Sequence, residues 1–266
     1  MSPAILPLLA CPDCREGLVL RAGAVYDHDD IDEASLECLA CERTFPVHQG
    51  ILRAMPSTLL AEQESEIKAR DEQVDQYEGM WYLNLFGKVE IPMTLRRLAP
   101  NRGHLMLEAG CGTGRMTPHL ADRVKHLVSV DFSFESLRVN SVKLKTAGVT
   151  SVDLVQADLC NLPFRPDMFD RVVSCQVLEH IPGPGARAKA IECLSGVARR
   201  GATVVISAYQ HSLLTREKEG SHDGGIPFFR FTRSEFRELL ASRMRVDSVT
   251  GKLVYIYLAR CTKDPA

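Results

Sequence analysis

Four cysteines near the start of the chain have the spacing of a metal site. They form two pairs with two residues inside each pair: Cys11 with Cys14, and Cys38 with Cys41. Zinc prefers tetrahedral thiolate sites, with each sulfur about 2.3 Å from the ion. A thioredoxin-type redox pair is the alternative, but no βαβ pattern surrounds Cys11. The segment is too short to form a core by itself, so the spacing predicts a structural zinc site.

A glycine-rich turn follows the apolar run at residues 104–109. The letters E-A-G-C-G-T-G place Gly110, Gly112 and Gly114 between a predicted strand and a predicted helix. Glycines allow a tight turn and let a ligand approach the backbone, while the helix start offers free N–H groups. A turn of this kind also caps helices without binding anything. The residues downstream therefore decide whether this turn is predicted to bind a ligand.

Polar side chains end three later strands. Asp131 lies about 20 residues after the glycines, Asp158 ends the next strand, and Gln176 follows the one after. Open α/β sheets bind ligands at the carboxyl ends of their strands. Asp131 alone could simply cap the next helix. Together with the glycines, these positions predict a ligand whose ribose hydroxyls bind Asp131.

Alternating strands and helices position these residues. Short apolar runs predict strands at 104–109, 126–130, 152–157, 170–175 and 202–208. Helical patterns fill the gaps at 115–123, 134–147, 186–199 and 233–243. This alternation is typical of a parallel sheet, whereas residues 244–249 and 253–260 predict two adjacent antiparallel strands. A charged helix over residues 57–84 carries a thin apolar stripe and is predicted to lie on a surface.

Composition limits the class of protein. The chain has 266 residues, of which 45% are hydrophobic and 25% charged, with a net charge of −2 and a pI near 6.5. These values exclude disorder and a polycation that binds nucleic acid through overall charge. No apolar run reaches the roughly 18 residues of a membrane span, and we expect no targeting segment. The chain is predicted to be cytoplasmic, with nine reduced cysteines.

The motifs resemble those of a known enzyme family. Over residues 75–260, E-x-G-C-G-T-G and V-L-E-H-I are similar to class I S-adenosylmethionine-dependent methyltransferases of the type 11 group. The cysteine pairs and F-P-V-H-Q-G-I at 45–51 resemble a Trm112-type zinc ribbon. The resemblance implies an α/β fold, with a Rossmann-like, seven-stranded, mostly parallel sheet whose last strand is antiparallel. Expected domains are a zinc ribbon at 1–56, a helical linker or lid at 57–100, and an S-adenosylmethionine-binding domain at 101–266.

The resemblance also implies roles for single residues. Glu108 matches the acid that reaches toward the methionyl amino group, Asp131 the acid for both ribose hydroxyls, and Asp158 the acid for the adenine amino group. The other implied contacts come from the glycine loop and the strand ends: Gly110, Cys111, Gly112, Thr113, Gly114, Phe132, Leu159 and Gln176. Cys111, Asp158 and the antiparallel last strand favour the methyl donor over NAD.

Methyl transfer from a sulfonium chiefly requires alignment of two reactants. A general base is needed only when the acceptor keeps its proton until attack. The candidates are His180 with its neighbour Glu179, and His211 or His222 in the long segment after the fifth strand.

The long segment at 209–231 is predicted to shape the acceptor site. It is too long for a simple connection and contains Phe228, Phe229 and Phe231. We expect it to close over the donor, together with the helix ending near Trp81.

The net charge of the N-terminal residues helps to distinguish an RNA acceptor from a small-molecule acceptor. Residues 1–56 contain four arginines and nine acidic residues, a net charge of −5. Basic surfaces favour phosphate binding, so this acidic ribbon is poorly suited to binding RNA. The sequence therefore favours a small-molecule acceptor, with ribosomal RNA or tRNA methylation second and a non-catalytic donor-binding module third. No pattern in the sequence indicates an oligomeric state.

Overall fold

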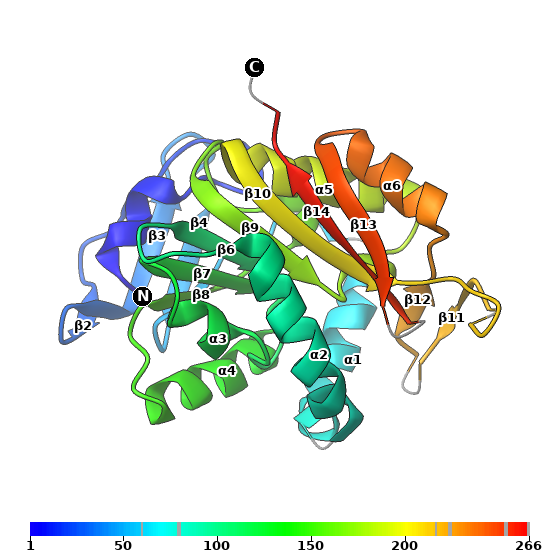
Figure 1. Cartoon of the computed structure of the whole chain (residues 1–266). Helices are drawn as coiled ribbons and strands as arrows, with labels where there is room; N and C mark the ends of the chain where they lie inside the picture. Colours follow the sequence, from blue (N-terminus) through cyan, green and yellow to red (C-terminus); the bar gives the residue numbers. More distant parts are fainter. Residues whose placement is uncertain (60, 79–80, 216, 223–224, 253–254, 265–266) are drawn as a thin grey trace.

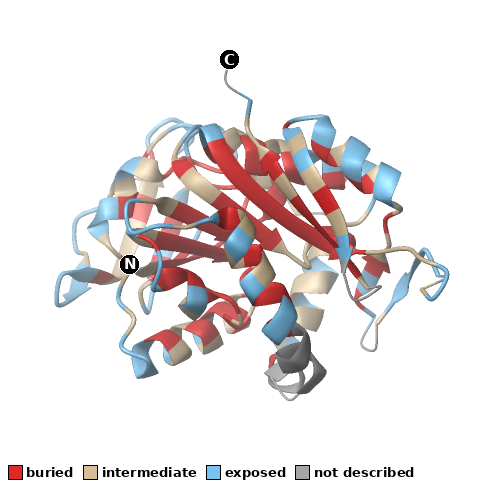
Figure 2. Cartoon of the chain, viewed as in Figure 1, coloured by how far each residue is buried: buried red, intermediate tan, exposed pale blue. Residues whose placement is uncertain are grey.

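A computed structural model gives the fold as a mixed α/β layer structure (Figure 1). It describes residues 1–59, 61–78, 81–215, 217–222, 225–252 and 255–264. One large sheet runs through the molecule, with helices packed on both of its faces. Parallel sheets bury both faces in this way, so their strands are apolar throughout. Figure 2 shows the central strands as the most buried part of the chain.

The first 53 residues form a small β-rich unit. After a short 3-10 helix, η1, come five strands, of which β1, β3, β4 and β5 pair antiparallel in that order. The bounds are η1 Pro3–Leu8, β1 Leu18–Leu20, β2 Val25–Asp27, β3 Asp30–Cys38, β4 Thr44–His48 and β5 Ile51–Arg53.

Two helices connect this unit to the main sheet. Helix α1 covers Ala61–Glu78 and α2 covers Trp81–Leu98, so the predicted helix over 57–84 belongs to two elements. Pro92 lies inside α2. Figure 1 shows α2 lying across the front face of the sheet and α1 beside the carboxyl ends of the parallel strands.

Residues 105–262 contribute the predicted seven strands to the large sheet, which has 12 strands among the residues that the structure describes. Their order is β8-β7-β6-β9-β10-β14-β13; β14 runs antiparallel to both of its neighbours, β10 and β13, and the other pairs are parallel. The strands are β6 Leu105–Ala109, β7 His126–Asp131, β8 Val152–Gln156, β9 Phe169–Cys175, β10 Ala198–Tyr209, β13 Arg245–Lys252 and β14 Ile256–Thr262. The helices between them are α3 Thr117–Ala121, α4 Phe134–Thr146, η2 Leu159–Asn161, η3 Leu178–His180, α5 Pro184–Val197 and α6 Arg233–Ala241. The predicted fold class is confirmed.

A short hairpin was not predicted. Strands β11 (Glu219–Ser221) and β12 (Pro227–Phe229) pair antiparallel within the long segment after β10. The sequence predicted only that the segment at 209–231 closes over the donor, without strands of its own.

The N-terminal unit continues the main sheet. Strand β5 pairs parallel with β8, with Ile51 opposite Leu154 and Arg53 opposite Gln156. Figure 1 shows the blue strands lying in line with the green ones. A shared core joins the two parts, in which Leu9, Leu52 and Phe164 are fully buried.

No helix among the residues that the structure describes has both the length and the apolar character needed to cross a bilayer.

Candidate functional sites: a four-cysteine centre and a donor cavity

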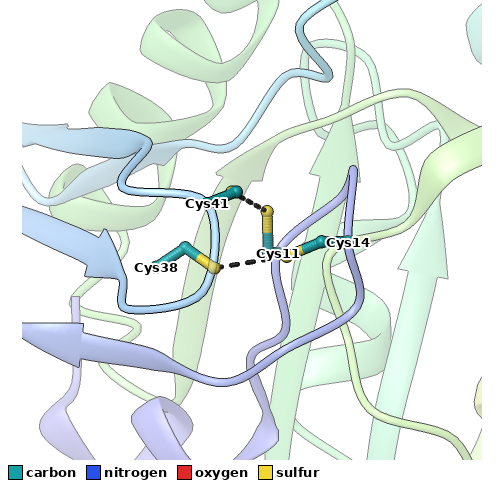
Figure 3. Close-up of side chains that lie close together, drawn as sticks. All are labelled: Cys11, Cys14, Cys38 and Cys41. Carbon is teal, nitrogen blue, oxygen red and sulfur yellow. Dashed lines mark hydrogen bonds between the residues drawn. The ribbon is translucent and has the colours of Figure 1, made fainter.

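The four predicted cysteines come together at one end of the sheet. All four sulfurs lie within 4.8 Å of one another (Figure 3). Cys11 Sγ is 3.7 Å from Cys41 Sγ, and Cys14 Sγ is 3.3 Å from Cys38 Sγ. Four sulfurs in a tetrahedron around zinc lie about 3.8 Å apart when each bond is about 2.3 Å. The donor set therefore fits zinc without rearrangement of the loops.

The two cysteine pairs have matching backbone turns. The N–H of Arg15 donates to the carbonyl of Cys11, and the N–H of Glu42 donates to that of Cys38. Arg15 and Glu42 both adopt positive φ, at 70° and 60°. Because each turn closes just after its second cysteine, both sulfurs of a pair face the same point.

A cavity opens at the carboxyl ends of the parallel strands. The predicted donor-site residues that line it are Glu108, Gly110, Cys111, Gly112, Thr113, Asp131, Phe132, Asp158, Leu159 and Gln176. Gly114 lies outside this lining. The structure thus brings ten of the eleven predicted residues to one cavity, as the convergence of parallel strands requires.

Two glycines of the loop are required by close packing. Gly110 and Gly114 have φ of 80° and 86°. A Cβ on Gly110 would lie 2.1 Å from Val177, and one on Gly114 would lie 2.1 Å from Asn140 Oδ1. Gly114 therefore contributes to the site by letting the loop pack against α4.

Asp131 ends β7 and fixes the glycine loop. Its carboxylate accepts hydrogen bonds from the N–H groups of Gly112 (2.7 Å) and Ser133 (3.0 Å). Burial raises the pKa of Asp131, while these two N–H groups oppose the rise. The side chain thus orders the loop and lines the cavity, whereas the cap of the following helix is Ser133, whose side chain accepts from the N–H of Ser136.

Glu108 is buried beneath the loop. Its Oε2 accepts hydrogen bonds from Thr117 Oγ1 and Ser129 Oγ, both at 2.8 Å. Burial raises the pKa of Glu108 to about 7, despite the opposing effect of the two hydroxyls.

Asp158 caps the short helix after β8 and contacts α1. Its Oδ1 accepts from the N–H of Cys160 at 2.9 Å. Its Oδ2 accepts from Asn161 Nδ2 at 3.0 Å and from Gln63 Nε2 at 3.3 Å. An amide N–H of α1 thus donates to the carboxylate that the family resemblance assigns to the adenine amino group.

Gln176 has a left-handed backbone conformation, and its side chain bonds a buried glutamate. Its φ is 57°, and its Nε2 donates to Glu90 Oε2 at 2.6 Å. Glu90, on α2, also accepts from Arg115 Nη2 (2.8 Å) and Ser207 Oγ (3.0 Å). This buried carboxylate ties α2 to the ends of β9 and β10.

Helix α1 turns polar side chains toward the cavity. Gln63, Glu66, Arg70 and Val74 all line it. Glu66 pairs with Arg70 at 3.6 Å, and burial raises its pKa to about 7, with Asp131 and Asp158 adding to the rise. The sequence predicted a surface helix because its apolar stripe is thin. The structure instead buries part of its polar face, where Glu66 pairs with Arg70 beside the cavity, and no pattern in the sequence indicates this burial.

The three candidate histidines occupy different places. His180 lines the cavity, and its Nδ1 lies 2.9 Å from the carbonyl of Pro227. Burial lowers the pKa of His180 well below its usual value. His222 lies next to it, with ring centroids 5.6 Å apart, but outside the cavity lining. His211 also lies outside the lining.

The phenylalanines after β10 pack inward rather than facing an acceptor. Phe228 and Phe231 are buried in apolar clusters, and Phe229 packs against Arg187 at 4.2 Å. Ile226 is the residue of this segment that lines the cavity. The expectation that these rings form the lid is therefore corrected. The side chain of Trp81 lies outside the described part of the chain.

Two family models match the chain. Residues 107–206 match the methyltransferase domain, and residues 2–50 match the Trm112p-like protein family. The chain therefore joins a Trm112-like domain to a methyltransferase domain, as the sequence motifs indicated.

Curated relatives share the central part of the chain. A demethylmenaquinone methyltransferase of Clavibacter sepedonicus is 34% identical over 116 residues, which cover 44% of this chain and 45% of that protein. A tRNA (carboxymethyluridine(34)-5-O)-methyltransferase of Arabidopsis thaliana is 30% identical over 43% of this chain and 27% of that protein. The chain spans less than half the length of these two relatives.

Solved structures share the fold. The DhpI complex with SAH has a TM-score of 0.62 at 22% identity, covering 79% of this chain and all of that one. An S-adenosylmethionine-dependent methyltransferase from Aquifex aeolicus has a TM-score of 0.58 at 17% identity, covering 73% and 98%. The architecture is that of S-adenosylmethionine-dependent methyltransferases.

Proposed function

We propose that the protein transfers a methyl group from S-adenosylmethionine to a small molecule. The observation that carries this proposal is the single cavity that the predicted donor residues share with α1, η3 and Ile226. Asp131 and Asp158 would hold the ribose and adenine parts, and the glycine loop with Gln176 the methionine part. When bound, the donor supplies an electrophilic methyl group on a sulfonium.

The chain's own residues orient the reactants and exclude water. Helix α1 covers the donor acids, since Gln63 bonds Asp158 and Asp71 accepts from Ser133 Oγ at 2.5 Å. Enclosure strengthens electrostatic contacts and fixes the acceptor near the methyl group. Removal of translational freedom accounts for much of the barrier reduction in such displacements.

Charge supports a small acceptor rather than RNA. The Trm112-like domain has a net charge of −5 before any Zn(Cys)4 centre adds more negative charge. An RNA substrate would need basic surfaces along its backbone. RNA remains the second candidate, because one relative is named as a tRNA methyltransferase. The predictions of a bound zinc ion and of a cytoplasmic location are the same for both candidate functions.

A labelling experiment tests the choice of acceptor. Purified protein is incubated with methyl-labelled S-adenosylmethionine and either a small-molecule extract or total RNA. We expect label to enter the small-molecule fraction. Label in RNA alone would favour the second candidate, whereas donor binding without transfer to either fraction would favour the non-catalytic module.

A further inference from the structure

Two arginines line the donor cavity, and each lies near a different part of the predicted donor site. Arg115 follows the glycine loop, and Glu90 Oε2 accepts hydrogen bonds both from Arg115 Nη2 (2.8 Å) and from Gln176 Nε2 (2.6 Å). Arg115 also opposes the rise in the pKa of Glu108. The methionine end of the predicted donor site therefore has a cation of its own.

Arg70, on α1, lies near the ribose acid instead. Its neighbour Asp71 accepts a hydrogen bond from Ser133 Oγ, two residues after Asp131. Arg70 also opposes the rise in the pKa of Asp131 and helps to lower the pKa of His180. The ribose and adenine parts of the donor carry no negative charge, so they leave this cation without a partner.

The protein satisfies the Arg70 guanidinium only in part. A guanidinium has five N–H donors. Among the residues that the structure describes, Arg70 pairs with Glu66 at 3.6 Å, and its Nε has no hydrogen-bond partner. Its side chain is 23% exposed and lines the cavity. An anion in the cavity would supply the acceptors that this guanidinium lacks.

Glu66 is a weak partner for Arg70. Burial raises the pKa of Glu66 to about 7, Asp131 and Asp158 add to the rise, and Arg70 opposes it. About half of the Glu66 side chains therefore carry a proton at pH 7. In those molecules the charge of Arg70 is not balanced by the one carboxyl that lies beside it.

The cavity wall near Arg70 suits an apolar ligand body. Val74 lies one turn further along α1, Ile181 follows η3, and Ile226 precedes β12, and all three line the cavity. None of them is a predicted donor contact. The free space beside Arg70 is therefore bounded by one cation and by aliphatic side chains from three segments.

We propose, on the basis of the methyl transfer proposed above, that Arg70 binds a carboxylate group of the methyl acceptor. The acceptor class is accordingly a small carboxylic acid with an apolar body. Its carboxylate accepts two hydrogen bonds from the guanidinium and replaces Glu66 as the partner of Arg70. Glu66 then binds a proton from solvent, because a second carboxylate beside it disfavours its charged form, as Asp131 and Asp158 already do. Arg70 thus selects the acceptor and takes no part in the bond changes at sulfur.

Binding of benzoate tests the proposal without knowledge of the natural acceptor. The full chain is saturated with S-adenosylhomocysteine, and benzoate is compared by calorimetry with benzamide, which has the same shape and no charge. We expect benzoate to bind about tenfold or more tightly than benzamide, and Arg70→Gln to remove this difference. Arg70→Lys should restore part of it. Glu66→Gln should tighten benzoate binding at pH 8, because the competing carboxylate is gone.

A matched control removes a cation from the same helix. Lys68, whose side chain is 78% exposed, lies on α1 outside the cavity lining. Lys68→Gln should therefore bind benzoate as wild type does. Benzoate that binds wild type no better than benzamide, or that binds Arg70→Gln as well as wild type, would overturn the proposal.

Donor analogues separate the acceptor's carboxylate from that of the donor. Arg70→Gln should bind S-adenosylhomocysteine and 5′-methylthioadenosine, which lacks the amino acid part, as tightly as wild type does. A loss of affinity of about tenfold or more for S-adenosylhomocysteine alone would show that Arg70 holds the donor's carboxylate. That result would overturn the proposal.

Transfer to a fractionated extract links the binding site to the reaction. A small-molecule extract is separated at pH 8 on an anion exchanger, and each fraction is incubated with labelled donor. We expect the retained, anionic fraction to supply the acceptor, and Arg70→Gln to raise KM more than it lowers kcat. Label from the unretained fraction alone would overturn the proposal and leave the proposed function standing. Absence of transfer to both fractions would contradict the proposed function, and the benzoate titration would still decide the role of Arg70.

Discussion

At the scale of single residues, the donor cavity concentrates carboxyl groups. Glu66, Glu108, Asp131 and Asp158 all line it, and Arg70 and Arg115 are the arginines in its lining. The backbone N–H groups at Asp131 and the hydroxyls at Glu108 partly compensate for their burial. A ligand with hydroxyl, amino and ammonium groups suits such a surface, because each carboxylate needs donors.

Removal of Asp131 should weaken the donor site. Asp131→Ala removes both the predicted ribose contacts and the acceptor for the Gly112 N–H. We expect a loss of about 1–3 kcal/mol in binding of S-adenosylhomocysteine, or roughly 5- to 150-fold in Kd, measured by calorimetry. Asp122→Ala, on an exposed turn, should bind normally. Preference for NAD over the donor analogue would restore the dehydrogenase interpretation.

The ionisation of Glu66 should make stability fall with rising pH. Its folded pKa of about 7 lies above the ordinary 4.5, so the neutral form is favoured in the folded state. The corresponding stability is present below pH 4.5 and is lost as the pH rises through 7. Glu66→Gln should therefore raise the unfolding temperature of the ligand-free protein at pH 8 by about 2 °C or more, but not at pH 5. Exposed Glu64→Gln is the control, and a lower unfolding temperature of Glu66→Gln at pH 8 would contradict this account.

Some of the residues in and around the cavity could be predicted from the sequence, and others could not. Gly110, Asp131 and Asp158 could be predicted because glycine turns and strand-end acids have fixed spacing along the chain. Glu66 and Glu90 could not, since they lie on helices whose rotation relative to the sheet is set by tertiary packing. The sequence pattern of α1 also suggested exposure where its polar face is partly buried.

At the scale of elements, the cysteine loops form the most sharply defined unit. Two turns of the same conformation, from loops 24 residues apart between Cys14 and Cys38, meet around one point. Their spacing made this prediction possible without knowledge of the strands between them. The C-x-x-C spacing, present twice, is a feature of each loop's local geometry, which does not depend on the rest of the fold.

Loss of one cysteine should release the metal. We expect one zinc per chain by elemental analysis, and Cys38→Ser should lose it and unfold the N-terminal unit locally. Structural zinc binding contributes on the order of 10 kcal/mol to folding. Cys193→Ser, on α5 outside the cluster, should retain the metal. Zinc retained after loss of the cluster thiols would show that the ion binds elsewhere.

Strands and helices of the main sheet were predictable from their alternation. Predicted runs at 126–130 and 152–157 correspond closely to β7 and β8. The division between α1 and α2 and the hairpin of β11 and β12 were not predicted. Their sequences lack the apolar periodicity that a packed element normally imposes.

At the scale of the whole molecule, the two domains share one core. Leu9 is fully buried and forms a β-bridge with Phe164 across the junction. This junction was beyond sequence analysis, because it depends on pairing between segments more than 100 residues apart. The domain boundaries at 56 and 100 remain predictions, since the sheet itself continues across the first of them.

Disturbance of the junction should destabilise both parts together. Leu9→Ala should cost about 2–5 kcal/mol through the cavity it leaves. In urea, zinc release and loss of far-ultraviolet circular dichroism should shift to lower concentration together. Leu39→Ala is the control, because Leu39 is 71% exposed in the same unit. Two separate transitions would show that the parts fold independently.

The pairing of β5 with β8 has a consequence for shortened versions of the protein. In a seven-stranded sheet alone, β8 would be an outer strand with unpaired N–H and C=O groups along Val152–Gln156. Such strands template the addition of further strands and promote aggregation. The Trm112-like domain covers this edge, so a version that begins after residue 56 should self-associate in a concentration-dependent manner even when its donor cavity is intact.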